Sequence, residues 1–176
     1  MYEAVIFDLD GVLCSTDEFH YLAWKKLADR LHIPFGRADN RRQRGVSRME
    51  SLEILLEKSD VSYSEEQKRE LAAEKNAEYV RLLQNLTEAD LSDEVRQTLN
   101  ALRAMGLKLA VGSSSRNTRT ILEKIGLGGF FDAVADGNDI RHSKPDPEVF
   151  LVAAQRLGLA PSVCLVVEGA QAGIDA

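Results

Sequence analysis

The segment AVIFDLDG, residues 4–11, decides the fold class. Its first half is a short apolar run with β-branched side chains, and its second half becomes polar at Asp8 and Asp10. This pattern is typical of a strand that is buried on both faces and ends in a polar loop. We therefore predict a central parallel strand at residues 4–7, with two carboxylates directly after it.

The rest of the chain divides into a helical stretch and an α/β stretch. From about residue 17 to residue 90, apolar side chains recur at spacings of three and four, which predicts helices with almost no strand between them. Helices are then predicted at residues 95–102, 118–125 and 147–157, alternating with strands at residues 107–111, 133–134 and 163–167. Strands separated by helices of about ten residues favour a parallel sheet with right-handed crossovers. We expect an α/β core of residues 1–15 and 91–176, with residues 16–90 inserted as an all-helical cap.

The composition narrows the possible partners. The chain has 176 residues and a formal net charge of −6, and an acidic chain repels nucleic-acid phosphates, so we expect no nucleic-acid partner. No apolar stretch approaches the roughly 18 residues of a membrane span, and the first residues lack the basic segment and long apolar run that are typical of a signal peptide. We therefore expect a cytoplasmic protein without a membrane partner. Cys14 and Cys164 lie far apart in the sequence, which favours reduced, buried thiols over a zinc site or a disulfide framework.

Polar residues follow each predicted strand. Asp8 and Asp10 follow the first, residues 113–115 are three serines after the second, and Lys144 and Glu168 come later. Two carboxylates in this spacing are by themselves a weak signal, because a solvated turn has the same pattern. The carboxyl ends of parallel strands meet at one edge of the sheet, however, so a serine and a lysine there can reach an anion beside the carboxylates.

Four motifs in this order resemble those of the haloacid dehalogenase superfamily of phosphotransferases: residues 7–12 (FDLDGV), 111–113 (VGS), 143–147 (SKPDP), and 167–168 (VE) followed by 171–173 (QAG). The resemblance covers nearly the whole chain and implies a doubly wound parallel sheet. Within the superfamily, the inserted segment is similar to the cap of the β-phosphoglucomutase family at residues 18–20, 24, 44–48 and 75–76, and the core is similar to that family at residues 113–117.

The resemblance implies a reaction and a catalytic set. Asp8 would become an aspartyl phosphate, Asp10 would be the acid and base, and Ser113 and Lys144 would bind the transferring phosphoryl group. Mg²⁺ would be bound by the Asp8 carboxylate, the Asp10 main-chain carbonyl and Glu168. The expected activity is the interconversion of β-glucose 1-phosphate and glucose 6-phosphate through glucose 1,6-bisphosphate, by a monomer whose cap closes near Thr16.

The same resemblance implies a substrate-binding set: His20, Trp24, Gly45, Val46, Ser47, Arg48, Lys75, Ser115, Arg116 and Asn117. Several of these residues have a plainer interpretation. His20 and Trp24 could be packed helix residues, and Lys75 could be one of many helix-surface lysines. Arg48 is the better candidate for the non-reacting phosphate, because a guanidinium grips such a group with two hydrogen bonds. The arginines at residues 41, 42 and 44 fit a solvated face.

Two departures from the family pattern keep other functions open. Gly169 stands where the family has a second acid, which predicts a weakened magnesium site. The chain ends at Ala176, inside the helix after the fourth motif, so we expect a core truncated at its C-terminus with an open sheet edge. The alternatives to a mutase are a sugar-phosphate phosphatase of the same superfamily and a catalytically impaired sugar-phosphate binding protein.

Overall fold

A single parallel sheet of four strands, in the order β3-β2-β1-β4, organises the computed structural model, which describes residues 1–176. The strands are β1 (Ala4–Phe7), β2 (Lys108–Gly112), β3 (Ala133–Ala135) and β4 (Cys164–Val167). The chain runs outward from β1 through β2 to β3 and returns to β4 on the other side of β1. The winding therefore reverses between β1 and β4, and in such sheets ligands bind beyond the carboxyl ends of the strands at this point.

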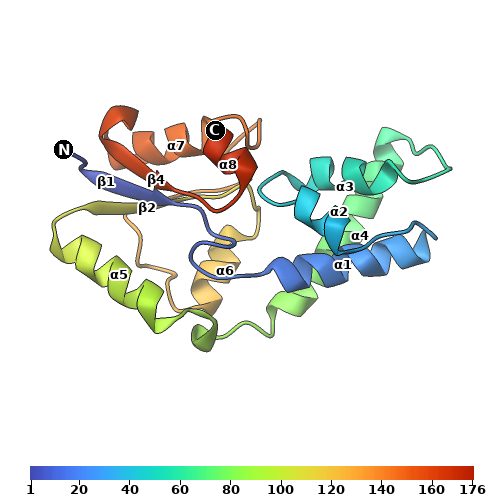
Figure 1. Ribbon diagram of the computed structural model, residues 1–176, viewed down its shortest axis with the longest axis horizontal. Helices are drawn as coiled ribbons and strands as arrows, with labels where there is room; N and C mark the ends of the chain where they lie inside the picture. The colour runs from blue at the N-terminus through green and yellow to red at the C-terminus, as the bar shows by residue number, and fades with distance from the viewer.

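Strand β1 is central because its side chains are apolar on both faces. Val5 and Phe7 belong to a hydrophobic cluster with α5 (Asp93–Ala104) and α6 (Thr118–Lys124), and Ala4 and Ile6 belong to a second cluster with α7 (Glu148–Leu157). Figure 1 shows α5 and α6 on one side of the sheet and α7 and α8 (Gln171–Asp175) on the other. The prediction of a doubly wound α/β sheet is confirmed.

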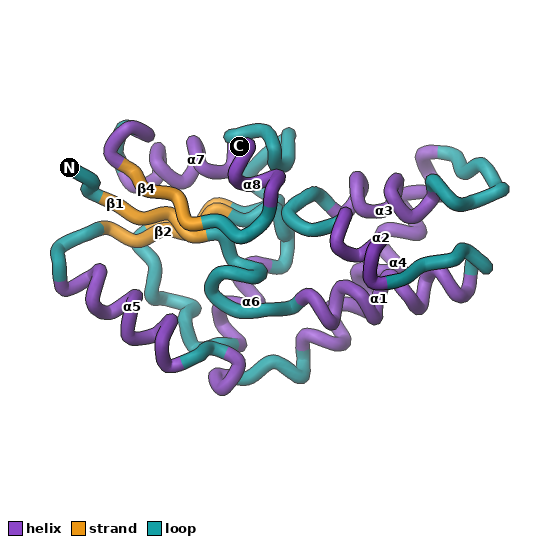
Figure 2. Tube along the Cα trace, viewed as in Figure 1, coloured by secondary structure: helices purple, strands orange, loops and turns teal.

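Four of the helices between β1 and β2 form a separate group. They are α1 (Asp17–Arg30), α2 (Arg37–Arg42), α3 (Arg48–Leu56) and α4 (Glu65–Leu83), and Figure 2 shows them beyond the strand ends. Of these, α1, α3 and α4 contribute to a hydrophobic cluster of their own. Ser47 and Ser64 precede α3 and α4 as the N-cap residues of capping boxes. In each box the serine hydroxyl oxygen accepts a hydrogen bond from the backbone N–H three residues later, and the side chain of that later residue accepts one from the serine backbone N–H. The short helices η1 (Glu88–Asp90) and η2 (Pro161–Val163) complete the chain.

The predicted strands and the predicted core helices differ from the observed ones by at most two residues at their ends. One expectation about side chains was wrong: Cys164 is only partly buried, whereas Cys14 is buried. The reason is that Cys164 begins β4, which pairs with β1 on one side and has no strand on the other. No helix combines the length and the apolarity that crossing a membrane would need.

Gly137 is expected to be indispensable for the loops at the strand ends. A Cβ at this position would overlap the carbonyl oxygen of Ser114 and lie 3.1 Å from the backbone nitrogen of Arg116. We expect Gly137→Ala to lower the free energy of unfolding by about 1–3 kcal/mol, as overpacking does. Chemical denaturation of this variant beside Gly129→Ala, where a Cβ meets nothing within 4 Å, measures the difference, and equal stability of the two variants would contradict the prediction.

Candidate active site

A fully buried ammonium group lies at the reversal point of the sheet. Lys144 has no exposed surface, and its Nζ donates hydrogen bonds to Asp8 Oδ1 at 2.8 Å and to a carboxylate oxygen of Glu168. Asp8 follows β1, Glu168 follows β4, and Lys144 lies in the loop before α7. Since two carboxylates surround one ammonium, one negative charge stays uncompensated when both acids are ionised.

The Asp8 carboxyl is harder to ionise than that of an exposed aspartate, because it is buried. Burial raises its pKa to about 6, although the neighbouring Lys144 ammonium acts in the opposite direction. Asp8 is 5% exposed and lines the cavity described below. A carboxylate that is poorly solvated but ionised at neutral pH is suited to act as a nucleophile.

The second carboxylate, Asp10, is held by a single residue. The backbone N–H of Thr16 donates to Asp10 Oδ1 at 2.6 Å, and the Thr16 hydroxyl donates to Asp10 Oδ2 at 2.9 Å. Burial raises the pKa of Asp10, and these two hydrogen bonds lower it. Thr16 precedes α1, so the first turn of the helical segment sets the orientation of this carboxylate.

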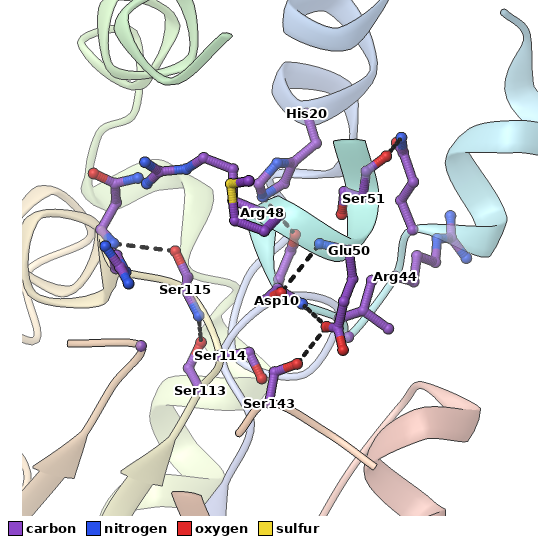
Figure 3. A pocket seen from close by; sticks show the side chains of 18 of the residues that line it. Asp10, His20, Arg44, Arg48, Glu50, Ser51, Ser113, Ser114, Ser115 and Ser143 are labelled. Atoms are coloured by element: carbon purple, nitrogen blue, oxygen red, sulfur yellow. Dashed lines mark hydrogen bonds and ion pairs between the residues drawn. The ribbon is translucent and has the colours of Figure 1, made fainter. Parts of the chain in front are cut away.

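Two further basic side chains approach Asp10 from the helical segment. His20 Nε2 lies 3.7 Å from Asp10 Oδ2, and His20 Nδ1 lies 2.8 Å from Lys75 Nζ. Figure 3 shows His20 pointing from its helix toward Asp10. Burial, with the nearby cations, lowers the pKa of both His20 and Lys75 well below their ordinary values. When Lys75 is an ammonium it donates to Nδ1, which leaves the proton of His20 on Nε2, facing the carboxylate.

A cavity of about 690 Å³ separates the helical segment from the sheet. Asp8, Asp10 and Ser113 line it, and so does every residue of the predicted substrate-binding set: His20, Trp24, Gly45, Val46, Ser47, Arg48, Lys75, Ser115, Arg116 and Asn117. Lys144 and Glu168 do not line it but lie behind Asp8. Trp24 also packs in the hydrophobic cluster of the helices, so it belongs to the core and to the cavity wall at once.

The serines after β2 form a loop with hydroxyl groups free to donate. Ser113 Oγ accepts a hydrogen bond from the backbone of Ser115, and Ser115 Oγ accepts one from the backbone of Asn117, both at 3.2 Å (Figure 3). Because each hydroxyl uses a lone pair in these bonds, its proton remains available for an anion. Ser114 Oγ is buried and has no partner within the protein.

Four arginines that line the cavity have no acidic partner: Arg48, Arg69, Arg116 and Arg141. Arg48 begins α3 and Arg116 precedes α6, and the nearby Arg116, after burial, lowers the pKa of Arg48. Neither forms an ion pair, whereas Arg42 pairs with Glu57 and Arg44 pairs with Asp17. Two unpaired guanidinium groups from opposite walls of one cavity favour a multiply charged anion between them.

Two side-chain hydrogen bonds connect the helices to the core, and one of their four residues, Glu50, was not predicted from the sequence. The Ser143 hydroxyl donates to a carboxylate oxygen of Glu50, and Figure 3 shows the two side chains facing one another. Asn117 Nδ2 donates to Asn76 Oδ1 at 3.0 Å. The Ser47–Glu50 capping box was readable as a helix start, but nothing local indicated that Glu50 also reaches the loop before Lys144.

Magnesium, which the family resemblance implies, needs several oxygen ligands that point to one spot in near-octahedral geometry. The predicted ligand from Asp10 is its main-chain carbonyl, and both of its carboxylate oxygens accept hydrogen bonds from Thr16, so Asp10 offers no charged ligand. One oxygen of Glu168 is bonded by Lys144, and the other accepts bonds from the backbone of Gly169 and Ala170 at 2.8 and 2.9 Å.

Position 169 adds no ligand, because glycine has no side chain. The structure contains no cluster of three or more His, Cys, Asp or Glu side chains that could hold a metal ion. The predicted set of Asp8, Asp10 and Glu168 therefore does not fit a magnesium ion in the arrangement that the chain adopts.

The chain matches the family model of haloacid dehalogenase-like hydrolases over residues 2–176. It is 42% identical over 176 residues to a β-phosphoglucomutase from Bacillus subtilis, covering 99% of this chain and 78% of that protein. It is 31% identical over 177 residues to a phosphorylated carbohydrates phosphatase from Thermotoga maritima, covering 99% and 79%. The crystal structure of a β-phosphoglucomutase (pgmB) from Clostridium difficile is similar with a TM-score of 0.94 and 40% identity, covering 99% and 79%.

The raised pKa of Asp8 makes the stability of the protein depend on pH. In the unfolded chain Asp8 ionises near 3.8, and in the folded protein it ionises near 6. Its contribution to stability is therefore complete below the unfolded value and is lost as the pH rises through the folded value. We expect Asp8→Asn to unfold at a higher temperature than the wild type at about pH 8, with little difference at about pH 4.

Thermal unfolding at both pH values measures this effect. Glu168 still pairs with Lys144 in the variant, so the ammonium keeps a partner. Asp60→Asn is the matched control, because Asp60 is exposed and has no bonded partner, and its pH dependence should equal that of the wild type. An Asp8→Asn protein that is less stable than the wild type at the higher pH would contradict the prediction.

Gly169→Asp is expected to create magnesium affinity. A Cβ at Gly169 would lie 3.3 Å from the carbonyl oxygen of Gly11 and 3.6 Å from Val12 Cγ2, so a side chain fits after a small adjustment. Since affinity rises with the number of charged oxygen ligands, we expect magnesium to bind about tenfold or more tightly than in the wild type. Isothermal titration calorimetry measures it, with Gly169→Asn as the uncharged control; equal affinities in Asp and Asn variants would refute the prediction.

Proposed function

The chain belongs to the haloacid dehalogenase-like hydrolase family, and we propose that it is a β-phosphoglucomutase that interconverts β-glucose 1-phosphate and glucose 6-phosphate. It is a phosphotransferase, and the relatives named above, a mutase and a phosphatase of phosphorylated carbohydrates, support a sugar phosphate as its substrate.

One observation supports the choice of a mutase: side chains suited to bind a phosphate group line the cavity in two places. The first place is lined by Asp8 and Ser113, with Lys144 bonded to Asp8 from behind, and we assign the transferring phosphoryl group to it. The unpaired Arg48 and Arg116 offer a second place. A hydrolase needs only the first. An enzyme that passes through a sugar bisphosphate needs both, because the intermediate carries a phosphate at each end.

The proposed reaction begins with phosphorylated Asp8. A hydroxyl of the sugar phosphate attacks the phosphorus, the bond from phosphorus to the Asp8 oxygen breaks, and Asp10 accepts the hydroxyl proton. The bisphosphate then turns over, so that its other phosphate faces Asp8. Asp8 attacks that phosphorus, the sugar oxygen leaves with the proton held by Asp10, and the second sugar phosphate is released.

The helices contribute by excluding water. We propose that residues 16–90 act as a cap over the core of residues 1–15 and 91–176, because hydrolysis of the aspartyl phosphate would end the cycle. Two contacts between the parts, Ser143 with Glu50 and Asn117 with Asn76, support this role. Lys75 and His20 approach Asp10 from the same helices and are placed to bind sugar hydroxyls beside it.

A sugar-phosphate phosphatase is the second candidate. The identity to the phosphatase from Thermotoga maritima favours it, and a phosphatase would use the same Asp8 and Asp10 with water as the final acceptor. A catalytically impaired binding protein is the third, because Glu168 is fully engaged and Gly169 offers no carboxylate. The three candidates differ in whether phosphate moves to sugar, to water or to neither.

Removal of the Arg48 guanidinium separates these candidates. Charge-assisted hydrogen bonds contribute about 1.5–3 kcal/mol, so we expect Arg48→Gln to lower kcat/KM for β-glucose 1-phosphate roughly 10- to 150-fold. Cleavage of acetyl phosphate, which has no second phosphate, should stay near the wild-type rate. Formation of glucose 6-phosphate is measured in a coupled assay primed with glucose 1,6-bisphosphate.

Arg41→Gln is the matched control, because Arg41 is exposed on α2, does not line the cavity and forms no ion pair; it should behave as the wild type. Equal losses on both substrates in Arg48→Gln would contradict a second phosphate site at this residue. Release of inorganic phosphate without glucose 6-phosphate would identify a phosphatase, and inactivity of the wild type toward both substrates would favour the binding protein.

A further inference from the structure

Tyr79 connects three residues around Asp10 that come from different turns of the helical segment. It lies on α4, is 1% exposed, and its hydroxyl oxygen is 2.8 Å from Thr16 Oγ1. Its ring stacks on the ring of His20, with centroids 4.1 Å apart and an interplanar angle of 20°. Lys75 Nζ lies 4.5 Å from the centre of the same ring. One phenol side chain therefore contacts Thr16, His20 and Lys75 together.

The direction of the hydrogen bonds follows from the number of protons. An ionised carboxylate only accepts hydrogen bonds, so the Thr16 hydroxyl must donate its single proton in the hydrogen bond to Asp10 Oδ2. Thr16 Oγ1 can then only accept from Tyr79, which makes Tyr79 the donor in the 2.8 Å bond. The result is a chain from Tyr79 through Thr16 to Asp10, and bonds in such a chain strengthen one another.

The hydroxyl and the ring of Tyr79 have separable effects. The ring supports His20 and faces the Lys75 ammonium, and both contacts persist in a phenylalanine. The hydroxyl acts on Asp10 only through Thr16, since it forms no other side-chain hydrogen bond. Tyr79→Phe therefore removes the polarising donor and leaves the packing of the two helices in place.

We propose that Tyr79 is a positioning residue for Asp10: its hydroxyl holds the Thr16 hydroxyl as a donor to Asp10, and its ring holds His20 beside the same carboxylate. This inference rests on the proposed function, in which Asp10 moves the proton of the sugar hydroxyl. Without the Tyr79 donor, the Thr16 hydroxyl is a weaker donor to Asp10 and the carboxylate is less firmly oriented for proton transfer.

The first test compares Tyr79→Phe, Thr16→Val and the double variant in the mutase assay. A hydrogen bond to a positioned group corresponds to roughly a three- to tenfold change, so we expect kcat of Tyr79→Phe to fall by that factor while KM stays within about twofold. Since Tyr79 acts through Thr16, its loss should add nothing in the double variant, which should match Thr16→Val. Additive losses, or an unchanged kcat in Tyr79→Phe, would overturn the proposal.

The matched control is Tyr21→Phe. Tyr21 also lies in the helical segment and stacks on a neighbouring ring, that of Phe35 at 6.0 Å, but its hydroxyl forms no hydrogen bond within the protein. This variant should keep the wild-type kcat. A loss equal to that of Tyr79→Phe would show that removal of any tyrosine hydroxyl from this segment has the effect, and it too would overturn the proposal.

The second test does not depend on activity. The Thr16 N–H donates to Asp10 at 2.6 Å, and an amide proton in so short a bond to a carboxylate resonates far downfield in NMR spectra. We expect this resonance to move upfield in Tyr79→Phe and to stay in place in Tyr21→Phe. An unmoved resonance would overturn the positioning role. If the resonance moves in Tyr79→Phe but the wild type has no mutase activity, the positioning of Asp10 by Tyr79 stands and only the proposed function is refuted.

Discussion

The ion cluster of Lys144 with Asp8 and Glu168 is the interaction on which the arrangement of this protein depends. It joins the ends of β1 and β4, where the winding of the sheet reverses, to the loop before α7. The ring of Phe150 packs against the cluster, with its centre 4.6 Å from Lys144 Nζ. Loss of the Lys144 ammonium would leave two buried carboxylates without a cation, and leaving a buried charge unpaired is strongly destabilising.

The two carboxylates of the FDLDGV segment are separated in role by what surrounds them. Asp8 faces the core and shares a cation, whereas Asp10 is held by hydrogen bonds from Thr16, where the helices begin. Asp8 and Asp10, two residues apart, are therefore held by different parts of the molecule: Asp8 by the core and Asp10 by the residue before the helices. A movement of the helices relative to the sheet would change the surroundings of Asp10 and leave the Asp8–Lys144 contact in place. In the proposed function, the nucleophile would then stay fixed while the acid and base could be reoriented.

Sequence patterns predicted those parts of the site that depend on strand ends, and missed those that depend on helix packing. Asp8, Ser113 and Lys144 were predictable because parallel strands bring their carboxyl ends to one edge, whatever the intervening chain does. Tyr79 showed only the apolar periodicity of a helix, which does not tell a core tyrosine from one whose hydroxyl reaches Thr16 across a gap of 63 residues. The cavity lining was predicted through family resemblance, because spacing within the helices carries no information on what they face.

Glu50 would keep a hydrogen-bond partner if the helices moved away from the sheet. One of its carboxylate oxygens accepts a hydrogen bond from the Ser47 backbone, 2.9 Å away, as well as from the Ser143 hydroxyl. If Ser143 withdraws, Glu50 keeps its place in the capping box, so α3 loses no stabilising contact and Ser143 finds water instead. The Ser143–Glu50 hydrogen bond therefore defines one position of the helices over the sheet. It can be broken by thermal motion without the unfolding of any helix or strand.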